Sequence, residues 1–258
     1  MTMPEGELQG KSIAITRPID QARKLNELVI RSGGKPVSFP LIAIAPLADY
    51  SKFDHQLTDL ANYDWAIFIS SNAVQNGMPR LLNKLGSVPG NLRFAAIGPV
   101  TAAELAGFGV EQVLTPQDRF DSESLLGLAE MQQIEGKRFV IFRGIGGREV
   151  LADTLKARGA IVDFAECYQR INPQQNANVL TALWQNKQLD AIVVTSSEAM
   201  RHLLDLSDNG HANWIKNTVL CVNHARIAEL PQQLGLKIAI AKAPGDEAMQ
   251  QCLIEALR

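Results

Sequence analysis

Two short serine motifs have the composition of anion-binding sites. Ser70, Ser71 and Asn72 directly follow one apolar run, and Ser196 and Ser197 follow another. At the start of a helix, a serine hydroxyl caps the chain, and the free N–H groups of the first turn can hold an anion. One such motif is explained by capping alone. Two of them at the carboxyl ends of corresponding strands, where open α/β sheets bind ligands, leave capping and ligand binding as equal alternatives.

A second candidate site is the turn at residues 98–101, with the sequence GPVT. Gly98 would let a ligand approach the backbone, and the proline that follows suits the first position of a helix. Thr101 would point its hydroxyl toward the ligand, unless the turn is only a capped connection. We align this turn with residues 223–226 in the second half of the chain, where Arg226 either meets an anion or lies on the surface.

Three further side chains could act on a carboxylate or on a leaving group. Arg17 and Arg143 each end an apolar run, and we expect exposed guanidinium groups that pair with a carboxylate or phosphate. Arg143 also opens the run RGIGGRE, in which Arg148 is more simply explained by a surface ion pair. Tyr168 is either a packing residue of a half-buried strand or a phenol that donates a proton to a departing oxygen.

Motifs for cofactors and for other kinds of catalysis are missing from the sequence. The glycine-rich run is not G-x-G-x-x-G, since its third glycine comes one place early, which argues against NAD. No Walker loop, nucleophile elbow or H-E-x-x-H is present. Cys167, Cys221 and Cys252 are far apart, and the four histidines show no metal-binding spacing. We therefore expect no metal and no cofactor.

The elements that carry these residues form an alternating pattern. Apolar, β-like runs separated by helical patterns predict parallel sheets covered by helices on both faces. The expected strands are Ser12–Thr16, Trp65–Ser70, Phe94–Ile97, Val113–Leu114, Arg138–Phe142, Ala191–Thr195, Val219–Val222 and Lys237–Ala241.

The sequence also repeats itself once. KSIAITRP at Lys11 matches KRFVIFRG at Lys137, and DWAIFISSNAV at Asp64 matches DAIVVTSSEAM at Asp190, each at an offset of 126 residues. We predict an α/β protein of two similar lobes, each with a parallel sheet flanked by helices.

Two long extended runs, Lys35–Leu47 and Ala160–Ile171, interrupt the alternation at equivalent places in the repeat. Three prolines exclude a helix from the first run. We expect the two runs to pair as a two-stranded ribbon between the lobes, with a small-molecule site in the cleft beside it.

The composition excludes several classes of protein. Among 258 residues, 25 Lys and Arg stand against 27 Asp and Glu, and this net charge of −2 argues against non-specific binding of nucleic acid. The first ten residues are polar, and no apolar run reaches the ~18 residues of a membrane span. We expect a cytoplasmic monomer without nucleic-acid or membrane partners, because no long apolar stripe argues for a dimer.

In their order and spacing, several segments resemble the uroporphyrinogen-III synthase family. They are ITRP, FISSNAV, AIGPVTAAEL, FDSESLL, RGIGGREVLADTLKARGA and ECYQR, and the resemblance spans about Ser12 to Leu253. It implies a cofactor-free enzyme that cyclises the linear tetrapyrrole hydroxymethylbilane to uroporphyrinogen III, with loss of water and inversion of ring D. It also implies transient contact with the enzyme that makes the bilane.

The resemblance carries expectations for domains and site residues. Lobe one would comprise 1–36 and 172–258 and lobe two 48–164, with ribbon linkers at 37–47 and 165–171. The family tyrosine falls on Tyr168, while the turn at 223–226 lacks the family's glycine and threonine. Two other functions stay open, namely a non-enzymatic two-lobed binding module and a nucleotide-using α/β enzyme. The expected substrate-binding residues are Arg17, Ser70, Ser71, Asn72, Gly98, Thr101, Arg143, Ser196, Ser197 and Arg226.

Overall fold

The computed structural model describes residues 6–147 and 149–258, so Arg148 lies outside the described residues. The chain divides into two compact units. Unit 1 comprises the N-terminal part up to Ala43 together with Ile171–Arg258, and unit 2 comprises Ile44–Arg170. Unit 1 is therefore assembled from both end segments of the chain, whereas unit 2 is continuous.

Unit 2 is built on a sheet of six strands in the described part of the chain, in the order β3-β8-β7-β4-β5-β6. The pairings β4–β5, β4–β7, β5–β6 and β7–β8 are parallel. The central strands are buried on both faces, which explains their unbroken apolar sequences. The strands are β3 (Ala43–Ala45), β4 (Trp65–Phe68), β5 (Arg93–Ala96), β6 (Val113–Leu114), β7 (Arg138–Gly144) and β8 (Ile161–Ile171).

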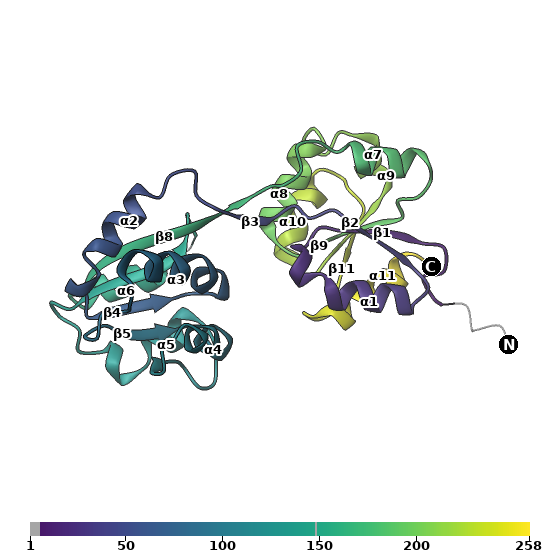
Figure 1. Ribbon diagram of the computed structural model, residues 1–258. Helices are drawn as coiled ribbons and strands as arrows, with labels where there is room; N and C mark the ends of the chain where they lie inside the picture. The colour runs from purple at the N-terminus through teal and green to yellow at the C-terminus, as the bar shows by residue number, and fades with distance from the viewer. Residues whose placement is uncertain (1–5, 148) are drawn as a thin grey trace. The chain divides into compact units, whose positions relative to one another are not determined.

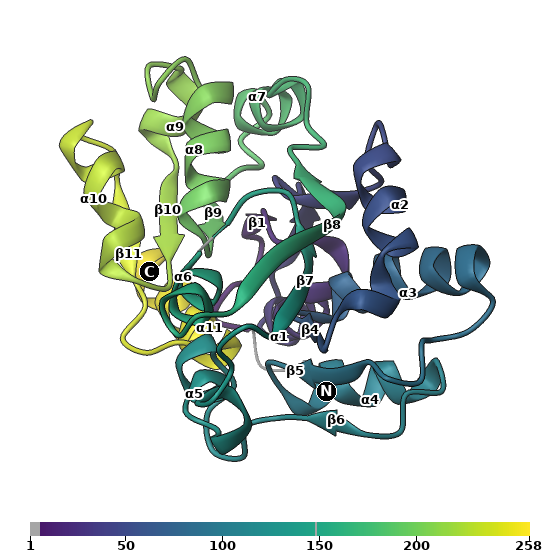
Figure 2. The ribbon, with the colours of Figure 1, turned by 90° about the vertical axis from the view of Figure 1, so that its left-hand side faces the viewer.

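Helices cover both faces of this sheet (Figures 1 and 2). One face carries α2 (Ser51–Thr58), α3 (Ser71–Leu85) and α4 (Pro99–Gly107), and the other carries α5 (Ser122–Leu126) and α6 (Val150–Ala157). The core beneath α2, α3 and α4 includes three stacked phenylalanine rings, those of Phe68, Phe94 and Phe142.

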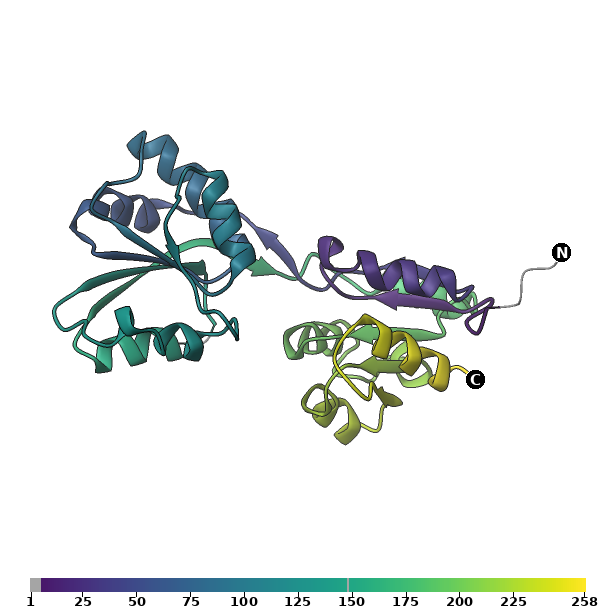
Figure 3. The same ribbon diagram turned by 90° about the horizontal axis from the view of Figure 1, so that it is seen from below.

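Unit 1 follows the same plan with five strands among the residues that are described, in the order β11-β10-β9-β1-β2, all pairs parallel. On one face, α1 and α11 lie side by side (Figure 3), and α7 to α10 cover the other face. The elements are β1 (Ser12–Ile15), α1 (Arg23–Arg31), β2 (Lys35–Ser38), α7 (Asn178–Gln185), β9 (Ala191–Val194), α8 (Ser197–Leu206), α9 (Asn213–Asn217), β10 (Val219–Val222), α10 (Ala225–Gln233), β11 (Ile238–Ile240) and α11 (Asp246–Ala256).

The two sheets correspond strand by strand at the offset of 126 residues seen in the sequence. β1 begins at Ser12 and β7 at Arg138, while β4 begins at Trp65 and β9 at Ala191. Because β1 pairs with β9 and β7 with β4, each unit combines the first half of one repeat with the second half of the other. The halves of the two repeats are thus exchanged.

An ion pair at the amino ends of the strands shows the same exchange. In unit 2, Lys137 Nζ lies 3.0 Å from Asp64 Oδ1, and the backbone N–H of Arg138 donates to the same carboxylate. In unit 1, Lys11 Nζ lies 3.7 Å from Asp190 Oδ1. In both pairs, the lysine and the aspartate come from different repeats.

The first extended run departs in part from the expected ribbon. Lys35–Ser38 forms β2, which pairs with β1 at the edge of the unit 1 sheet, and Ala43–Ala45 forms β3 beside β8. Pro36 is tolerated in β2 because an edge strand does not need every backbone N–H for pairing. Residues 37 and 38, expected in a linker, therefore belong to the sheet of unit 1.

Within residues 6–147 and 149–258, no helix combines the length and the apolar composition that a membrane span requires. In the same ranges, no group of three or more His, Cys, Asp or Glu side chains is placed to hold a metal ion.

Candidate functional site

Three of the predicted residues gather at the carboxyl ends of the unit 2 strands. β4 leads into α3 on one face of the sheet, and its neighbour β7 leads into α6 on the other face. Open α/β sheets bind ligands where the connections of two adjacent strands diverge in this way. Ser70 follows β4, Arg143 lies on β7 and Tyr168 lies on β8, so all three are at this edge.

Ser70 and Tyr168 are brought together by the fold. Ser70 Oγ and Tyr168 OH are 3.4 Å apart, although 98 residues separate them in the sequence. Ser70 is also the N-cap of α3 and accepts a hydrogen bond of 3.2 Å from the backbone N–H of Ala73. Tyr168 is only 4% exposed, and its ring belongs to the core beneath α3. The pair joins a candidate proton donor to the start of a helix.

Gly144 makes this contact sterically feasible. β7 lies between β8 and β4, so the Tyr168 ring has to cross β7 to reach Ser70. A Cβ atom on Gly144 would lie 2.5 Å from Tyr168 Cε2 and 2.7 Å from Cζ, closer than atoms can approach. The register of β8 also shifts here, because Arg143 pairs with Glu166 but Gly144 pairs with Tyr168. The sequence reading did not single out Gly144 for this role.

The thiol of Cys167, next to Tyr168, is buried in the core of unit 2. Cys167 is fully buried, and its Sγ lies 3.5 Å from the Arg143 carbonyl and 3.6 Å from the Ala73 carbonyl. Burial raises the pKa of the Cys167 thiol to about 12. The thiol is therefore protonated at neutral pH and is a poor nucleophile.

Arg143 lines a pocket on the opposite face of the same edge. The pocket has a volume of about 240 Å³, and its lining includes Ile69, Asp121, Arg170 and the glycines that follow Arg143. The expectation that Arg143 is exposed is wrong, because the residue is 4% exposed. Its guanidinium folds back onto the Gly144 and Gly146 carbonyls and lies 4.6 Å from the centre of the Phe164 ring.

The glycine-rich segment is shaped around this guanidinium. Gly146 and Gly147 have φ values of 71° and 103°, which favour glycine. A Cβ atom on Gly147 would lie 2.8 Å from Arg143 Nη2. No acidic side chain of the described residues forms an ion pair with Arg143, whose guanidinium contacts two carbonyl groups and the ring, although Asp121 and Glu123 also line the pocket. A ligand carboxylate would complete this environment.

The other predicted residues of unit 2 lie at neighbouring helix starts. Ser71 and Asn72 are the first two residues of α3, and both are half-buried. Gly98 is the N-cap of α4, and a Cβ there would come within 3.0 Å of the Phe120 side chain. Thr101, in the first turn of α4, is 6% exposed, so its side chain is buried.

In unit 1, Arg17 is engaged with other side chains of the unit. Its guanidinium forms an ion pair with Asp246 at the start of α11, and its Nε donates to Thr195 Oγ1 over 3.3 Å. Arg17 is therefore half-buried and not exposed as we expected. Asp246 stands 229 residues further along the chain, so no local signal could have paired the two residues.

The serine motif of unit 1 repeats the capping arrangement of unit 2. Ser196 is the N-cap of α8 and accepts a hydrogen bond of 3.1 Å from the backbone N–H of Ala199. Ser197 is the first helical residue and is half-buried. Capping, which was one of the two alternatives for each motif, is thus present in both.

The alignment of the second turn needs a correction of one residue. Gly98 and His224 are the N-caps of α4 and α10, and each is followed by a helix of nine residues. Arg226 therefore corresponds to Val100, and Ile227 stands at the position of Thr101. Arg226 is exposed in the first turn of α10. The starts of the two helices set this register.

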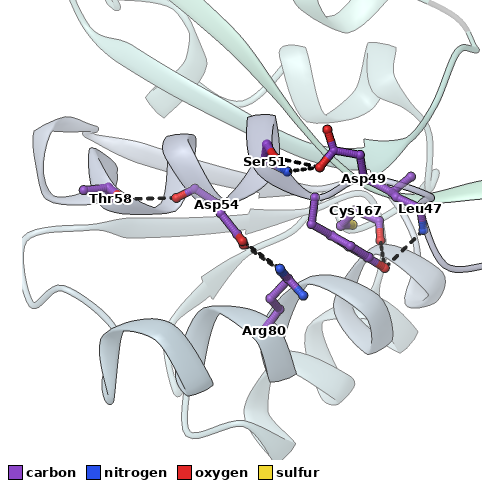
Figure 4. Close-up of polar contacts among 8 residues, drawn as sticks. Leu47, Asp49, Ser51, Asp54, Thr58, Arg80 and Cys167 are labelled. Atoms are coloured by element: carbon purple, nitrogen blue, oxygen red, sulfur yellow. Dashed lines mark hydrogen bonds and ion pairs between the residues drawn. The ribbon is translucent and has the colours of Figure 1, made fainter.

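A polar cluster holds α2 against the strand that carries Tyr168 (Figure 4). Tyr50 OH accepts from the backbone N–H of Leu47 at 3.3 Å and donates to the Cys167 carbonyl at 3.4 Å. The guanidinium of Arg80 lies 4.1 Å from the centre of the Tyr50 ring and binds both oxygens of Asp54. These contacts fix the backbone of β8 immediately before Tyr168.

The chain is similar to known proteins along nearly its whole length. The family model described as Uroporphyrinogen-III synthase HemD matches residues 23–251. The uroporphyrinogen-III synthase of Escherichia coli (strain K12) is 35% identical over 96% of this chain and 100% of that protein.

Solved structures are similar in fold. A mutant uroporphyrinogen III synthase from Thermus thermophilus matches with a TM-score of 0.61 and 18% identity over 96% of this chain and 98% of that one. The uroporphyrinogen-III synthetase of Helicobacter pylori 26695 matches with a TM-score of 0.60 and 18% identity, covering 96% of this chain and 100% of that one. These likenesses agree with the α/β fold of two parallel sheets.

Proposed function

The chain belongs to the uroporphyrinogen-III synthase family, and on this premise we propose that it is the cyclising carbon–oxygen lyase of tetrapyrrole biosynthesis. Its substrate would be hydroxymethylbilane, which it closes to uroporphyrinogen III with loss of water and inversion of ring D. The observation that carries the proposal is the similarity along the whole chain to a uroporphyrinogen-III synthase. The phenol of Tyr168 at the ligand-binding edge of a parallel sheet supports it.

For this reaction the protein has to supply one proton donor and to position the substrate accurately. Tyr168 donates its proton to the departing hydroxyl, which leaves as water. The pyrrole stabilises the azafulvene cation that remains. Ring D then attacks this cation through its substituted carbon, which carries no hydrogen, and the bond from that carbon to the methylene bridge of ring C breaks. The unsubstituted carbon of ring D bonds to that methylene instead, and the proton that it releases restores the phenol. Spontaneous closure gives the type I isomer, so the main task is to direct attack to the substituted carbon of ring D.

The eight carboxylates of the substrate need positive partners, and the chain has a net charge of −2. We propose that Arg143 binds one carboxylate in the pocket of unit 2, because its buried guanidinium has no acidic partner among the described residues. Ser71, Asn72 and Thr101 would contribute donors at the starts of α3 and α4, where the helix dipole favours an anion. Gly98 would let the substrate approach the backbone.

Unit 1 offers a second set of donors in the same structural positions. We propose that Ser196 and Ser197 at the start of α8, together with Arg17 and Arg226, bind further carboxylates of the substrate. For Arg17 this requires the carboxylate to compete with Asp246.

The cellular setting is part of the same proposal. All three cysteines are free and buried, which is typical of proteins from a reducing compartment, and we place the reaction in the cytoplasm. The bilane is unstable toward spontaneous closure, and direct transfer from the enzyme that forms it would limit this loss. We propose a monomer that contacts that enzyme transiently.

The test is a coupled assay in which a bilane-forming enzyme supplies fresh hydroxymethylbilane to the purified protein. The product is oxidised, and its isomers are separated. We expect the type III isomer with the protein present and the type I isomer without it. A product containing only type I in both reactions would contradict the proposal.

A further inference from the structure

We propose that Ser70 and Gly144 are positioning residues that together set the orientation of the Tyr168 phenol. This inference rests on the proposed function, in which Tyr168 assists departure of the substrate hydroxyl. Gly144 provides the space in which the ring crosses β7, and Ser70 holds the hydroxyl at the far side.

The space above Gly144 is fully taken up by the phenol ring. The ideal Cβ position of residue 144 is 2.5, 2.7 and 3.0 Å from three ring carbons of Tyr168. The shift in register places Tyr168, and not Cys167, opposite Gly144. Any larger residue at position 144 would therefore displace the ring from its path toward Ser70. The backbone immediately before Tyr168 is held by Tyr50, whose hydroxyl donates to the Cys167 carbonyl.

The hydrogen bonds of Ser70 determine where the phenol proton can go. Ser70 Oγ accepts from the backbone N–H of Ala73, and its own proton is available for the phenol oxygen 3.4 Å away. If Ser70 donates to Tyr168, the phenol proton is left for the substrate. The orientation of a proton donor is thereby coupled to the first turn of α3, a helix of 15 residues.

The other unit contains the same cap without the phenol. Ser196 caps α8 through Ala199 just as Ser70 caps α3 through Ala73. At the repeat offset, however, Tyr168 corresponds to Ile42. Loss of the Ser196 hydroxyl therefore serves as a matched reference for the effect of a lost cap on Tm and on the Tyr168 signal, and any shift of that signal specific to Ser70 belongs to the contact with Tyr168.

The contact is tested by NMR of protein that carries tyrosine labelled with carbon-13 at the ring Cζ. The chain has only three tyrosines, so the Tyr168 signal is identified by its loss in Tyr168→Phe. We expect Ser70→Ala to shift this signal, Ser70→Thr to restore it, and Ser196→Ala to leave it unmoved while lowering Tm by a similar amount. A Tyr168 signal that does not move in Ser70→Ala would overturn the inference.

Kinetics then test whether the contact serves the reaction. We expect Ser70→Ala and Gly144→Ala each to lower kcat about tenfold or more with KM changed less than twofold, because a misplaced catalytic group loses rate and not affinity. Combined with Tyr168→Phe, either change should lower kcat no further. If the losses in kcat from Tyr168→Phe and from the second substitution add in the double variants, the positioning role is overturned. An unchanged kcat in Tyr168→Phe alone would instead contradict the proposed role of Tyr168 as proton donor, whatever the NMR signal does, whereas failure of the proposed function itself would appear as the absence of the type III isomer.

Discussion

Arg17 and Asp246 form an ion pair that is largely shielded from water, with 14% and 15% of the two side chains exposed. The pair joins the end of β1 to the start of α11, and it occupies a guanidinium that we propose for substrate binding. Under this proposal, Asp246 would compete with the substrate for Arg17.

We expect Asp246→Asn to lower the KM for hydroxymethylbilane several-fold, because the substituted amide competes less strongly for Arg17. Arg17→Met should raise KM by about tenfold, the effect of one charge-assisted hydrogen bond. Steady-state kinetics of both variants in the coupled assay measure these effects. If both variants keep the KM of the parent protein, Arg17 does not bind substrate.

For Arg143, replacement by methionine should raise KM by about tenfold or more, since methionine keeps the bulk of the side chain and removes the charge. Arg158→Met is the matched control. Arg158 also donates to two carbonyls of unit 2, those of Leu126 and Met131, but it does not line the pocket. The control should lower Tm and leave KM unchanged. Equal KM values for Arg143→Met and the parent protein would rule out a carboxylate at this position.

The pair of Asp54 and Arg80 should make stability dependent on pH. The hydrogen bonds from Arg80 hold the pKa of the Asp54 carboxyl below its usual value. Stability from this pair is therefore complete above the unfolded pKa of about 4 and is lost as the pH falls through the lower folded value.

Asp54→Asn should accordingly cost about 0.5–1 kcal/mol at pH 7, because the side chains of Arg80 and Asp54 are 39% and 30% exposed. The difference from the parent protein should become smaller in acid. Urea unfolding of both proteins across this pH range measures it, and a constant difference would assign the cost to packing.

The phenol of Tyr63 should ionise only in strong alkali. Burial and the hydrogen bond of 2.8 Å to Asp163 raise the pKa of Tyr63 to about 12. Its contribution to stability is complete below the ordinary pKa of about 10 and is lost between about pH 10 and 12. Ultraviolet titration of tyrosinate should show a late step that Tyr63→Phe removes. A late step that persists in this variant belongs to another tyrosine.

Residues 44–170 should fold without the rest of the chain. This segment is continuous and contains its own sheet and both of its core clusters. We expect the fragment to unfold cooperatively in urea and to keep the circular dichroism of an α/β protein. The reciprocal fragment 171–258 lacks β1 and β2, so it should remain largely unfolded. Gradual, uncooperative unfolding of the first fragment would contradict the division into units.

The strands and their repeat could be predicted from sequence because buried parallel strands consist of uninterrupted apolar residues. Trp65–Phe68 and Ala191–Val194 lie inside the predicted ranges, and the offset of 126 residues relates the two sheets. The repeat does not give the order of the strands, which comes from their pairing in the structure. The exact division of the run at Lys35–Leu47 could not be predicted either, because edge strands and ribbons share one extended pattern.

The helix starts of the candidate site were predictable from the sequence, but the contacts of its residues were not. Ser70 and Ser196 follow apolar strands, so their capping role was visible. The burial of Arg143 was not, because its partners are backbone carbonyls and a ring brought in by β8. The Gly144 contact was equally hidden, since it depends on a shift of one residue in the register of β8.

The exchange of repeat halves sets the order in which the units can be completed on the ribosome. β1 leaves the ribosome early, but its neighbour β9 begins 176 residues after β1 ends. At about 5–20 residues per second, β1 waits on the order of ten to thirty seconds for this partner. Unit 2 is finished first, although its synthesis starts second. Until β9 has been made, the apolar strand β1, which is fully buried in the folded protein, lacks this neighbour.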